Sequence, residues 1–304
     1  MQLVVGTRGS PLAMTQTRWV VERLERLDHR LEIAVMEIRT QGDLRADAPL
    51  SSMPRGLFAK ELETALEHRR IDLAIHSFKD LPTVLPPGLT VAAITQREDP
   101  RDVLVAPGCR SLDALPPGAR LGTSSPRRSV QLRAYRADLK LLPVRGNVGT
   151  RVAKAAGPDL DGVVLAAAGL RRLGLEEHVT EYLDPDICLP EAGQGALALE
   201  TRADDQRAQE IAALVDDAAS HATVSAEVAV LLVLGGGCTT PIAAYAELGD
   251  GQITIRGMVA DASGARLLRS SASGPADQPE DVGTLLGRQL LDLGAGDIVG
   301  ADQR

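Results

Sequence analysis

Residues that could carry chemistry gather in the stretch AIHSFKDLP, which contains His76, Ser77, Lys79 and Asp80. The stretch includes the end of a short apolar run that predicts a buried strand, and open α/β sheets bind ligands at the carboxyl ends of their strands. A partly desolvated carboxylate near arginines could stabilise a cation formed during a reaction and transfer protons. The alternative is structural: Asp80 caps a turn, Lys79 is solvated and His76 packs within the sheet.

A second candidate is Cys238, which follows three glycines in the stretch LLVLGGGCTTPI. Glycines leave room near the sulfur for a bulky covalently bound group, and a thiolate is a good nucleophile. The alternative is that Gly235 ends the preceding helix and Cys238 is a small buried side chain. Cys109 and Cys188 lack this setting and are interpreted as structural. The cysteines show no CxxC or Cys/His spacing, so neither a disulfide framework nor a metal site is predicted.

Arginines recur at predicted strand-to-helix junctions that are rich in glycine and serine: Arg8, Arg127, Arg128, Arg145 and Arg151. Guanidinium groups bind carboxylates through paired hydrogen bonds, and small neighbours let a ligand approach the backbone. The pattern therefore indicates a small ligand with several carboxylates or phosphates. For each arginine alone, surface pairing with Asp or Glu is the alternative.

The elements that would position these residues alternate between strand and helix, which predicts an α/β fold with largely parallel sheets. One such segment precedes the polar stretch QREDPRD near residues 96–102, a candidate hinge, and a second extends to the stretch PDICLPEAGQG. The C-terminal residues differ, because consecutive predicted strands are followed by one helix. They are expected to form a smaller α+β domain.

Two of the strand-to-helix junctions are alike, VGTRGSPLA and LGTSSPRRS. Each places a serine N-cap and a proline at the start of a helix, where unpaired N–H groups and the helix dipole favour anions. In the first helix Ala13, Val20, Leu24 and Leu27 recur on one face and predict its buried side. Two capped helices that bind nothing are the alternative.

Composition excludes several classes of function. The 304 residues are 44% hydrophobic and 24% charged, as in ordinary globular proteins, and the net charge of -8 repels polyanions. Three tyrosines, two phenylalanines and one tryptophan offer few surfaces for base stacking, so nucleic acid binding is not expected. No apolar run is long enough to span a bilayer and no export signal is found, which predicts a cytoplasmic protein without membrane contact.

Seven motifs together resemble the porphobilinogen deaminase family: GTRGSPLA, GLFAKELE, HSFKDLP, GTSSPRR, RGNVGTR, GQGALALE and GGGCTTPI. They follow the family's order over nearly the whole chain, and seven in sequence are far more specific than any one. The resemblance implies a transferase of tetrapyrrole (heme) biosynthesis that joins four porphobilinogen molecules head to tail into hydroxymethylbilane. Ammonia is released at each step.

The resemblance also implies a dipyrromethane cofactor, one per chain, bound through a thioether to Cys238, and it makes Asp80 the catalytic residue. Loss of ammonia from porphobilinogen leaves an electron-poor azafulvene, whose positive charge a carboxylate can stabilise. Residues matching the family's cofactor contacts are Arg127, Arg128, Lys79, Ser77, Thr123, Ser124 and Ser125. Residues matching its substrate contacts are Arg8, Ser10, Arg145, Arg151 and Phe58. At Arg55 the family usually has lysine; arginine keeps the charge but changes its geometry, so of the family's contacts this one follows least directly from the resemblance.

By resemblance the fold has two lobes like those of periplasmic binding proteins, joined by a paired hinge, plus a smaller C-terminal domain. The expected domains are residues 1–96 with 196–217, residues 97–195, and residues 218–304, the last carrying the cofactor cysteine. A monomer is expected. There are two alternative functions. A binding protein that uses the lobes without chemistry would explain neither GGGC nor HSFKD, and a phosphoryl-transfer enzyme is disfavoured because the sequence contains no GxxxxGK[ST] motif.

Overall fold

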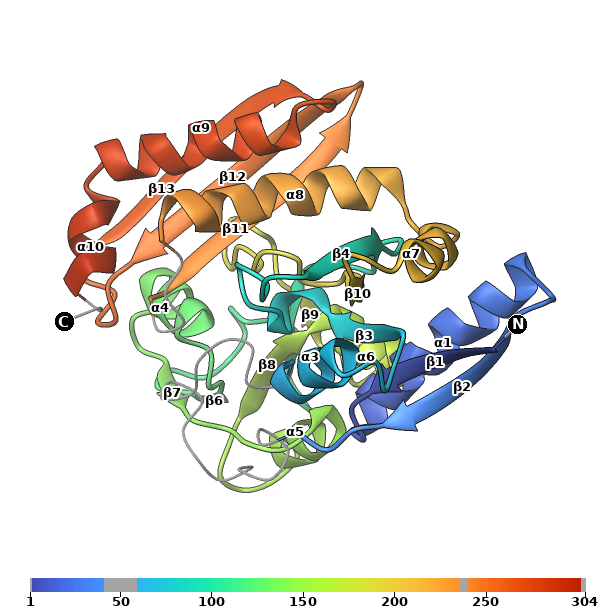
Figure 1. Ribbon diagram of the computed structural model, residues 1–304. Helices are drawn as coiled ribbons and strands as arrows, with labels where there is room; N and C mark the ends of the chain where they lie inside the picture. The colour runs from blue at the N-terminus through green and yellow to red at the C-terminus, as the bar shows by residue number, and fades with distance from the viewer. Residues whose placement is uncertain (1, 41–58, 236–239, 302–304) are drawn as a thin grey trace. The chain divides into compact units, whose positions relative to one another are not determined.

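The computed structural model describes residues 2–40, 59–235 and 240–301 (Figure 1). These residues form two compact units. Unit 1 takes its described residues from 1–46, 54–98 and 195–221, and unit 2 takes them from 99–194 and 222–304. The chain therefore passes from unit 1 into unit 2 and back before it enters the C-terminal region.

Unit 1 is built on a five-stranded sheet with the strand order β2-β1-β3-β10-β4. Strand β10 runs antiparallel to its neighbours β3 and β4, whereas β1 is parallel to β2 and β3. The strands are β1 (Gln2–Thr7), β2 (Glu32–Glu37), β3 (Leu73–Ser77), β4 (Leu89–Ile94) and β10 (Leu197–Arg202). The helices are α1 (Pro11–Leu27), α3 (Lys60–Glu67), the 3-10 helix η2 (Phe78–Asp80) and α7 (Gln206–Ala213).

Helix α1 begins as its sequence predicts. Ser10 is the N-cap, its hydroxyl accepts a hydrogen bond from the Ala13 N–H at 3.2 Å, and a proline occupies the first turn. Val20 and Leu24 are buried as expected. The prediction for Leu27 is wrong: this side chain is 54% exposed, because it is the last residue of the helix and the chain turns away after it.

Unit 2 contains a second five-stranded sheet, with the order β7-β6-β8-β5-β9. Here β5 is the antiparallel strand, paired with β8 and β9, and β6 is parallel to β7 and β8. The strands are β5 (Asp102–Val105), β6 (Arg120–Gly122), β7 (Lys140–Leu142), β8 (Gly162–Ala166) and β9 (Glu181–Tyr182). The helices are α4 (Pro126–Tyr135), α5 (Val148–Ala155), α6 (Ala167–Arg172) and the 3-10 helix η3 (Glu176–His178).

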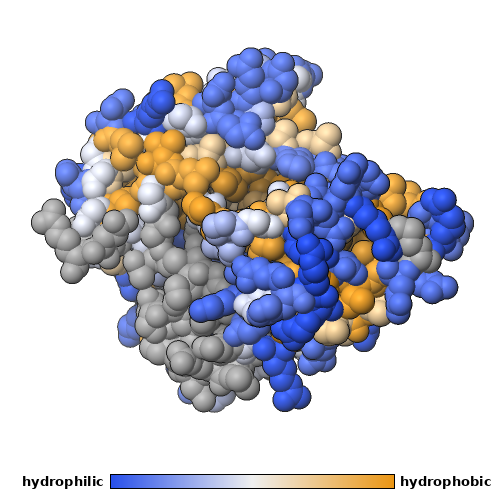
Figure 2. All heavy atoms as spheres, in the orientation of Figure 1, coloured by the Kyte–Doolittle hydropathy of each residue, from blue (hydrophilic) through white to orange (hydrophobic). Residues whose placement is uncertain are grey.

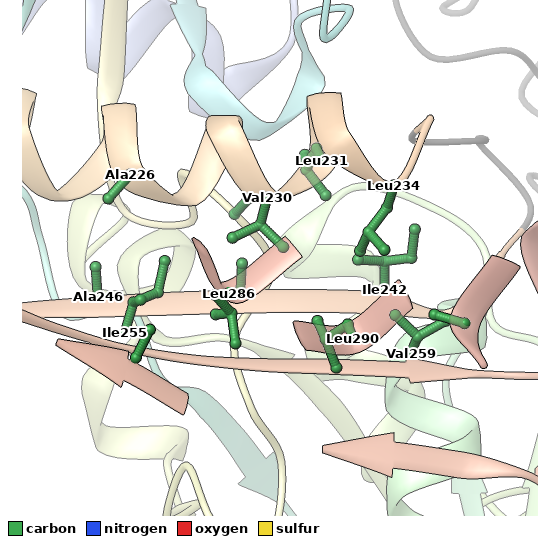
Figure 3. Packing of buried hydrophobic residues seen from close by; sticks show 14 of the residues in the cluster. Ala226, Val230, Leu231, Leu234, Ile242, Ala246, Ile255, Val259, Leu286 and Leu290 are labelled. Carbon is green, nitrogen blue, oxygen red and sulfur yellow. The ribbon is translucent and has the colours of Figure 1, made fainter. Parts of the chain in front are cut away.

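The C-terminal residues of unit 2 form an antiparallel sheet of β11 (Ile242–Gly249), β12 (Gln252–Ala260) and β13 (Leu267–Pro275). One face of this sheet packs against α8 (Ala218–Val233), α9 (Pro279–Asp292) and α10 (Ala295–Ala301). Figure 3 shows Val230 of α8 and Leu286 of α9 among the side chains that fill this core. A Cβ on Gly283 would lie 2.0 Å from the Ala226 carbonyl oxygen, so glycine permits the close approach of α9 to α8.

The opposite face of the same sheet contacts the rest of unit 2. Ala243, Met258 and Ala260 pack there with Val130 of α4 and Leu189. The alternation of buried residues between the two faces follows the period of a β-strand. The predicted α/β class with a smaller α+β C-terminal region is confirmed by these sheets, whereas the division into three domains stays a prediction.

The face of the molecule in Figure 2 carries hydrophilic residues with hydrophobic residues between them. Individual exposed apolar side chains are normal for globular proteins. Within the described ranges, none of the helices has both the length and the apolar character that crossing a bilayer requires.

Candidate active site

Unit 1 contains a small pocket that brings together four of the predicted site residues, Arg8, Ser10, Ser77 and Asp80. Its cavity volume is about 50 Å³. The remaining lining residues are Leu12, Ala13, Gln16, Ile75 and His76. The pocket therefore combines a carboxylate, a guanidinium group and two hydroxyls.

The sheet explains why these residues meet. Strands β1 and β3 are parallel neighbours, with Val5 opposite Leu73, so their carboxyl ends lie at the same edge. Arg8 and Ser10 follow β1 and precede the first turn of α1. Ser77 ends β3, and the chain then turns through η2 to Asp80.

The 3-10 helix that carries Asp80 is tied to the neighbouring strands. The Phe78 N–H donates to the Ala196 carbonyl at 3.0 Å, and the Leu81 N–H donates back to the Phe78 carbonyl at 3.0 Å. The Phe78 side chain packs against Ala198 and Leu81. Asp80 and its neighbour Lys79 are both half-buried. This anchoring fixes the backbone on both sides of the carboxylate.

Gln16 is a pocket residue that sequence reasoning missed. It is 4% exposed, and its amide exchanges hydrogen bonds with the Ser77 hydroxyl, at 3.1 Å from Nε2 and 3.2 Å to Oε1. A signal was present, because Gln16 shares the buried face of α1 with Val20 and Leu24, and a buried amide requires a partner. Gln16 holds the Ser77 side chain at the pocket wall.

His76, which lines the pocket, belongs to a buried group of ionisable side chains with Glu200 and Glu63. The His76 Nε2 lies 2.9 Å from Glu200 Oε2, without the angles of an aligned hydrogen bond. Burial raises the pKa of Glu63 to about 7, and the charge of Glu200 adds to the rise. The interpretation of His76 as a side chain packed in the sheet agrees with its burial. The two glutamates were not anticipated.

In unit 2 the loop before α4 holds the predicted residues Thr123, Ser124 and Ser125. The Ser124 hydroxyl donates to the Val144 carbonyl at 2.8 Å and accepts from the Val144 N–H at 3.1 Å. The Ser125 N–H donates to the Thr123 hydroxyl at 3.3 Å, and the Ser125 hydroxyl caps α4. These contacts shape the loop that leads into the arginine pair.

Arg127 and Arg128 both point into unit 2 and are nearly buried. Arg128 donates from Nε and Nη2 to Asp102 Oδ1, at 3.0 and 2.8 Å, and from Nη1 to the Val164 carbonyl at 3.1 Å. Arg127 donates from Nη1 to Asp102 Oδ2 and to the Leu189 carbonyl, both at 2.7 Å. The Nε and Nη2 atoms of Arg127 are buried and have no hydrogen-bond partner within the described chain.

The two remaining arginines flank the start of α5. Arg145 is half-buried, and its Nη2 is another buried atom without a hydrogen-bond partner among the residues described. Arg151 donates from Nε to the Gly146 carbonyl at 2.7 Å, and Asn147 caps the helix through the Thr150 N–H. The Arg145 nitrogen thus retains donor capacity for an anionic ligand.

Three residues considered from the sequence, Cys238, Phe58 and Arg55, lie outside the described residues. Gly235 has a φ of 69°, and its N–H donates to the Leu232 carbonyl at 3.2 Å, so it ends the helical turn as the cap interpretation expected. Cys188 is fully buried, and burial raises the pKa of its thiol to about 12. A thiol that stays protonated fits the structural role assigned to it.

Family comparisons cover most of the chain. Residues 3–210 match the family described as "Porphobilinogen deaminase, dipyromethane cofactor binding domain", and residues 221–292 match "Porphobilinogen deaminase, C-terminal domain". Together these two matches include the pocket and the arginine pair. The resemblance inferred from the seven motifs is confirmed.

Solved structures with a similar arrangement are distant in sequence. The methionine binding protein MetQ matches with a TM-score of 0.44 and 13% identity, over 78% of this chain and 96% of that one. A YaeC-family lipoprotein from Enterococcus faecalis matches with a TM-score of 0.42 and 14% identity, over 70% of this chain and 89% of that one.

Curated relatives are much more similar. A porphobilinogen deaminase from Syntrophus aciditrophicus is 48% identical over 291 residues, which are 95% of each chain. One from Desulforudis audaxviator is 48% identical over 299 residues, covering 98% of this chain and 97% of the relative. On these matches, which extend over nearly the full length of both partners, the chain belongs to the porphobilinogen deaminase family.

Proposed function

We propose that this chain joins porphobilinogen molecules head to tail into hydroxymethylbilane, with release of ammonia, and that Asp80 is its catalytic residue. Membership of the family supports the reaction. The observation that carries the assignment of the site is the pocket in which Asp80 and Arg8 face the same space. The carboxylate and the guanidinium group lie at the same edge of the sheet. The first suits a substrate that forms a cation when ammonia leaves, and the second suits the carboxylates of that substrate.

Asp80 would act on the pyrrole ring. When ammonia leaves, positive charge spreads over the ring and its N–H, and a carboxylate fixed beside that N–H stabilises the charge without reorganising. The same carboxylate can accept and return a proton during coupling. The anchored backbone of η2 supports this role, because it holds Asp80 at a constant place.

Arg8 would bind a substrate carboxylate. A guanidinium fork binds a carboxylate through two parallel hydrogen bonds. The 17-residue helix α1 begins at the same pocket, with Ser10 and Ala13 in the lining, so its positive dipole end favours the same anion. Ser77, held by Gln16, offers a further hydroxyl.

The residues of unit 2 fit a group rich in carboxylates such as the dipyrromethane named in the family's description. Arg127 and Arg145 keep buried donor atoms without partners among the described residues, and these are suited to acetate or propionate side chains. We assign the covalent attachment to Cys238. When bound, a dipyrromethane supplies the pyrrole α-carbon at which the chain grows. Arg127, Arg128 and the Thr123–Ser125 loop would hold its carboxylates.

Substitution of Asp80 tests the catalytic assignment. Asp80→Asn should lower the rate of porphobilinogen consumption by ~100-fold or more, as loss of a preorganised charge does, while leaving the melting temperature unchanged. Asp204→Asn is the matched control, because Asp204 is an exposed partner of Arg69 in the same unit. Full activity in Asp80→Asn would refute the assignment.

Intact-protein mass tests the attachment. The purified chain should be heavier than its sequence by one dipyrromethane, the adduct should map to Cys238, and Cys238→Ser should abolish it. Cys109→Ser, at a half-buried cysteine, should keep it. An unmodified mass after expression with excess porphobilinogen would instead favour a binding protein. The expected monomer and cytoplasmic location stay predictions, and light scattering on the purified protein measures the first.

A further inference from the structure

A single carboxylate, Asp102 at the start of β5, organises the arginine pair. It is fully buried and accepts five hydrogen bonds from side chains. Oδ1 receives Arg128 Nε, Arg128 Nη2 and Gln194 Nε2, the last at 2.9 Å, and Oδ2 receives Arg127 Nη1 and the Cys188 thiol, the latter at 3.3 Å. A carboxylate has about four lone-pair sites, so both oxygens of Asp102 are saturated.

The two arginines use this carboxylate differently. Arg128 gives it the Nε and Nη2 edge of its guanidinium group, which is the edge that forms paired hydrogen bonds. Arg127 gives it only Nη1, and the Leu189 carbonyl holds that same nitrogen. The paired edge of Arg127 is therefore turned away from Asp102, at a side chain that is 3% exposed.

The unpaired edge of Arg127 indicates that a ligand binds here. Buried guanidinium nitrogens are almost always hydrogen-bonded, and leaving both Nε and Nη2 of Arg127 without a partner is unfavourable. In the part of the chain that is described, no group satisfies them. One carboxylate of a bound molecule would satisfy both atoms at once.

We propose that Asp102 is a positioning residue that orients Arg127, so that its Nε and Nη2 edge receives one carboxylate of the bound pyrrole chain. This inference rests on the proposed function. Burial opposes the charge of Asp102, but the charges of Arg127 and Arg128 outweigh that effect and hold its pKa well below the usual range. The two guanidinium groups therefore favour the ionised form of the Asp102 carboxylate. The thiol of Cys188 and the amide of Gln194 complete its hydrogen bonding.

Asp102→Asn tests the inference in the full-length holoenzyme. The amide cannot accept from all five donors, so Arg127 loses its orientation, and the fraction of chains carrying the mass adduct should fall by ~10-fold or more. Asp161→Asn, which breaks the partly exposed pair with Arg120 in the same unit, should leave that fraction unchanged. A folded Asp102→Asn with full loading and an unchanged KM for porphobilinogen overturns the inference.

Arg127→Lys distinguishes the orientation of the Arg127 guanidinium group from simple charge pairing with Asp102. It also provides the test of the inference if Asp102→Asn does not fold. Lysine can pair with Asp102 as a point charge but has no paired edge. A folded Arg127→Lys with ~10-fold lower loading supports the inference, and one with normal loading overturns it. In a double-mutant cycle, Asp102→Asn should lower loading little further in the Arg127→Lys background. A wild-type chain that carries no mass adduct and has no activity would instead refute the proposed function.

Discussion

The buried acid Glu63 gives a prediction about stability that follows from unit 1 alone. Its side chain lies on α3 and is 7% exposed, and its Oε1 atom has no hydrogen-bond partner in the described residues. Burial, followed by the charge of Glu200, raises its pKa from 4.5 to about 7, and His76 offsets part of that rise. With a pKa near 7, Glu63 keeps its proton in about half of the folded molecules at pH 7, whereas the unfolded chain has lost it.

The size and sign of the effect follow from this difference. Below pH 4.5 the Glu63 carboxyl is protonated in both the folded and the unfolded state, so its titration does not lower the free energy of unfolding. Between pH 4.5 and 7 the unfolded chain loses the proton first, so the free energy of unfolding decreases as the pH rises. Above pH 7 the loss of free energy of unfolding reaches its full size, and the shift in the pKa of Glu63 corresponds to ~3 kcal/mol.

Glu63→Gln removes the titration while nearly preserving the shape of the side chain. Denaturant unfolding at pH 4.5 and pH 8 should show the variant close to the wild type at pH 4.5 and more stable by up to ~3 kcal/mol at pH 8. Glu22→Gln, at an exposed position of α1, is the control and should follow the wild type at both values. If Glu63→Gln and the wild type lose the same free energy of unfolding over this range, the proton is not held by Glu63 and the reasoning fails.

Three further substitutions test the packing and the pocket. Gly283→Ala should lower the free energy of unfolding by ~2 kcal/mol in denaturant melts, because the new Cβ meets the Ala226 carbonyl. Ser10→Ala should cost ~1 kcal/mol in the same assay through loss of the N-cap of α1, and equal stability would contradict the capping role. Gln16→Ala should lower kcat/KM for porphobilinogen by ~10-fold, because Ser77 loses the amide that holds it; an unchanged value would show that the Ser77 orientation does not matter.

Local sequence signals account for most of the elements. Ser10 and Ser125 with their following prolines mark the starts of α1 and α4, and the motif HSFKDLP marks the end of β3. Such signals work because caps and strand ends are decided by neighbouring residues. The two-residue strand β9 and the helix α10 gave no comparable signal and were missed.

The buried charged groups could not be predicted in the same way. Glu200 ends the motif GQGALALE, and on a strand it could face either water or the core. Its partner His76 is on a different strand, and only the antiparallel pairing of β10 with β3 brings the two side chains together. Glu63 then approaches from α3. A local pattern cannot give this arrangement, because it depends on the order of strands in the sheet.

The polar stretch QREDPRD, the candidate hinge, is not exposed along its whole length. Its last residue, Asp102, is fully buried, and the amide of Gln194, 92 residues later, donates to it and to the Pro100 carbonyl. In unit 1 the Glu98 N–H likewise donates to the Gly195 carbonyl at 3.1 Å. The two segments in which the chain passes from one unit to the other are therefore hydrogen-bonded to each other, once within unit 1 and again within unit 2. A buried carboxylate requires hydrogen-bond partners, and here those partners are far away in the sequence. The burial of Asp102 therefore cannot be predicted from the polar run QREDPRD without the second polar segment, which contains Gln194.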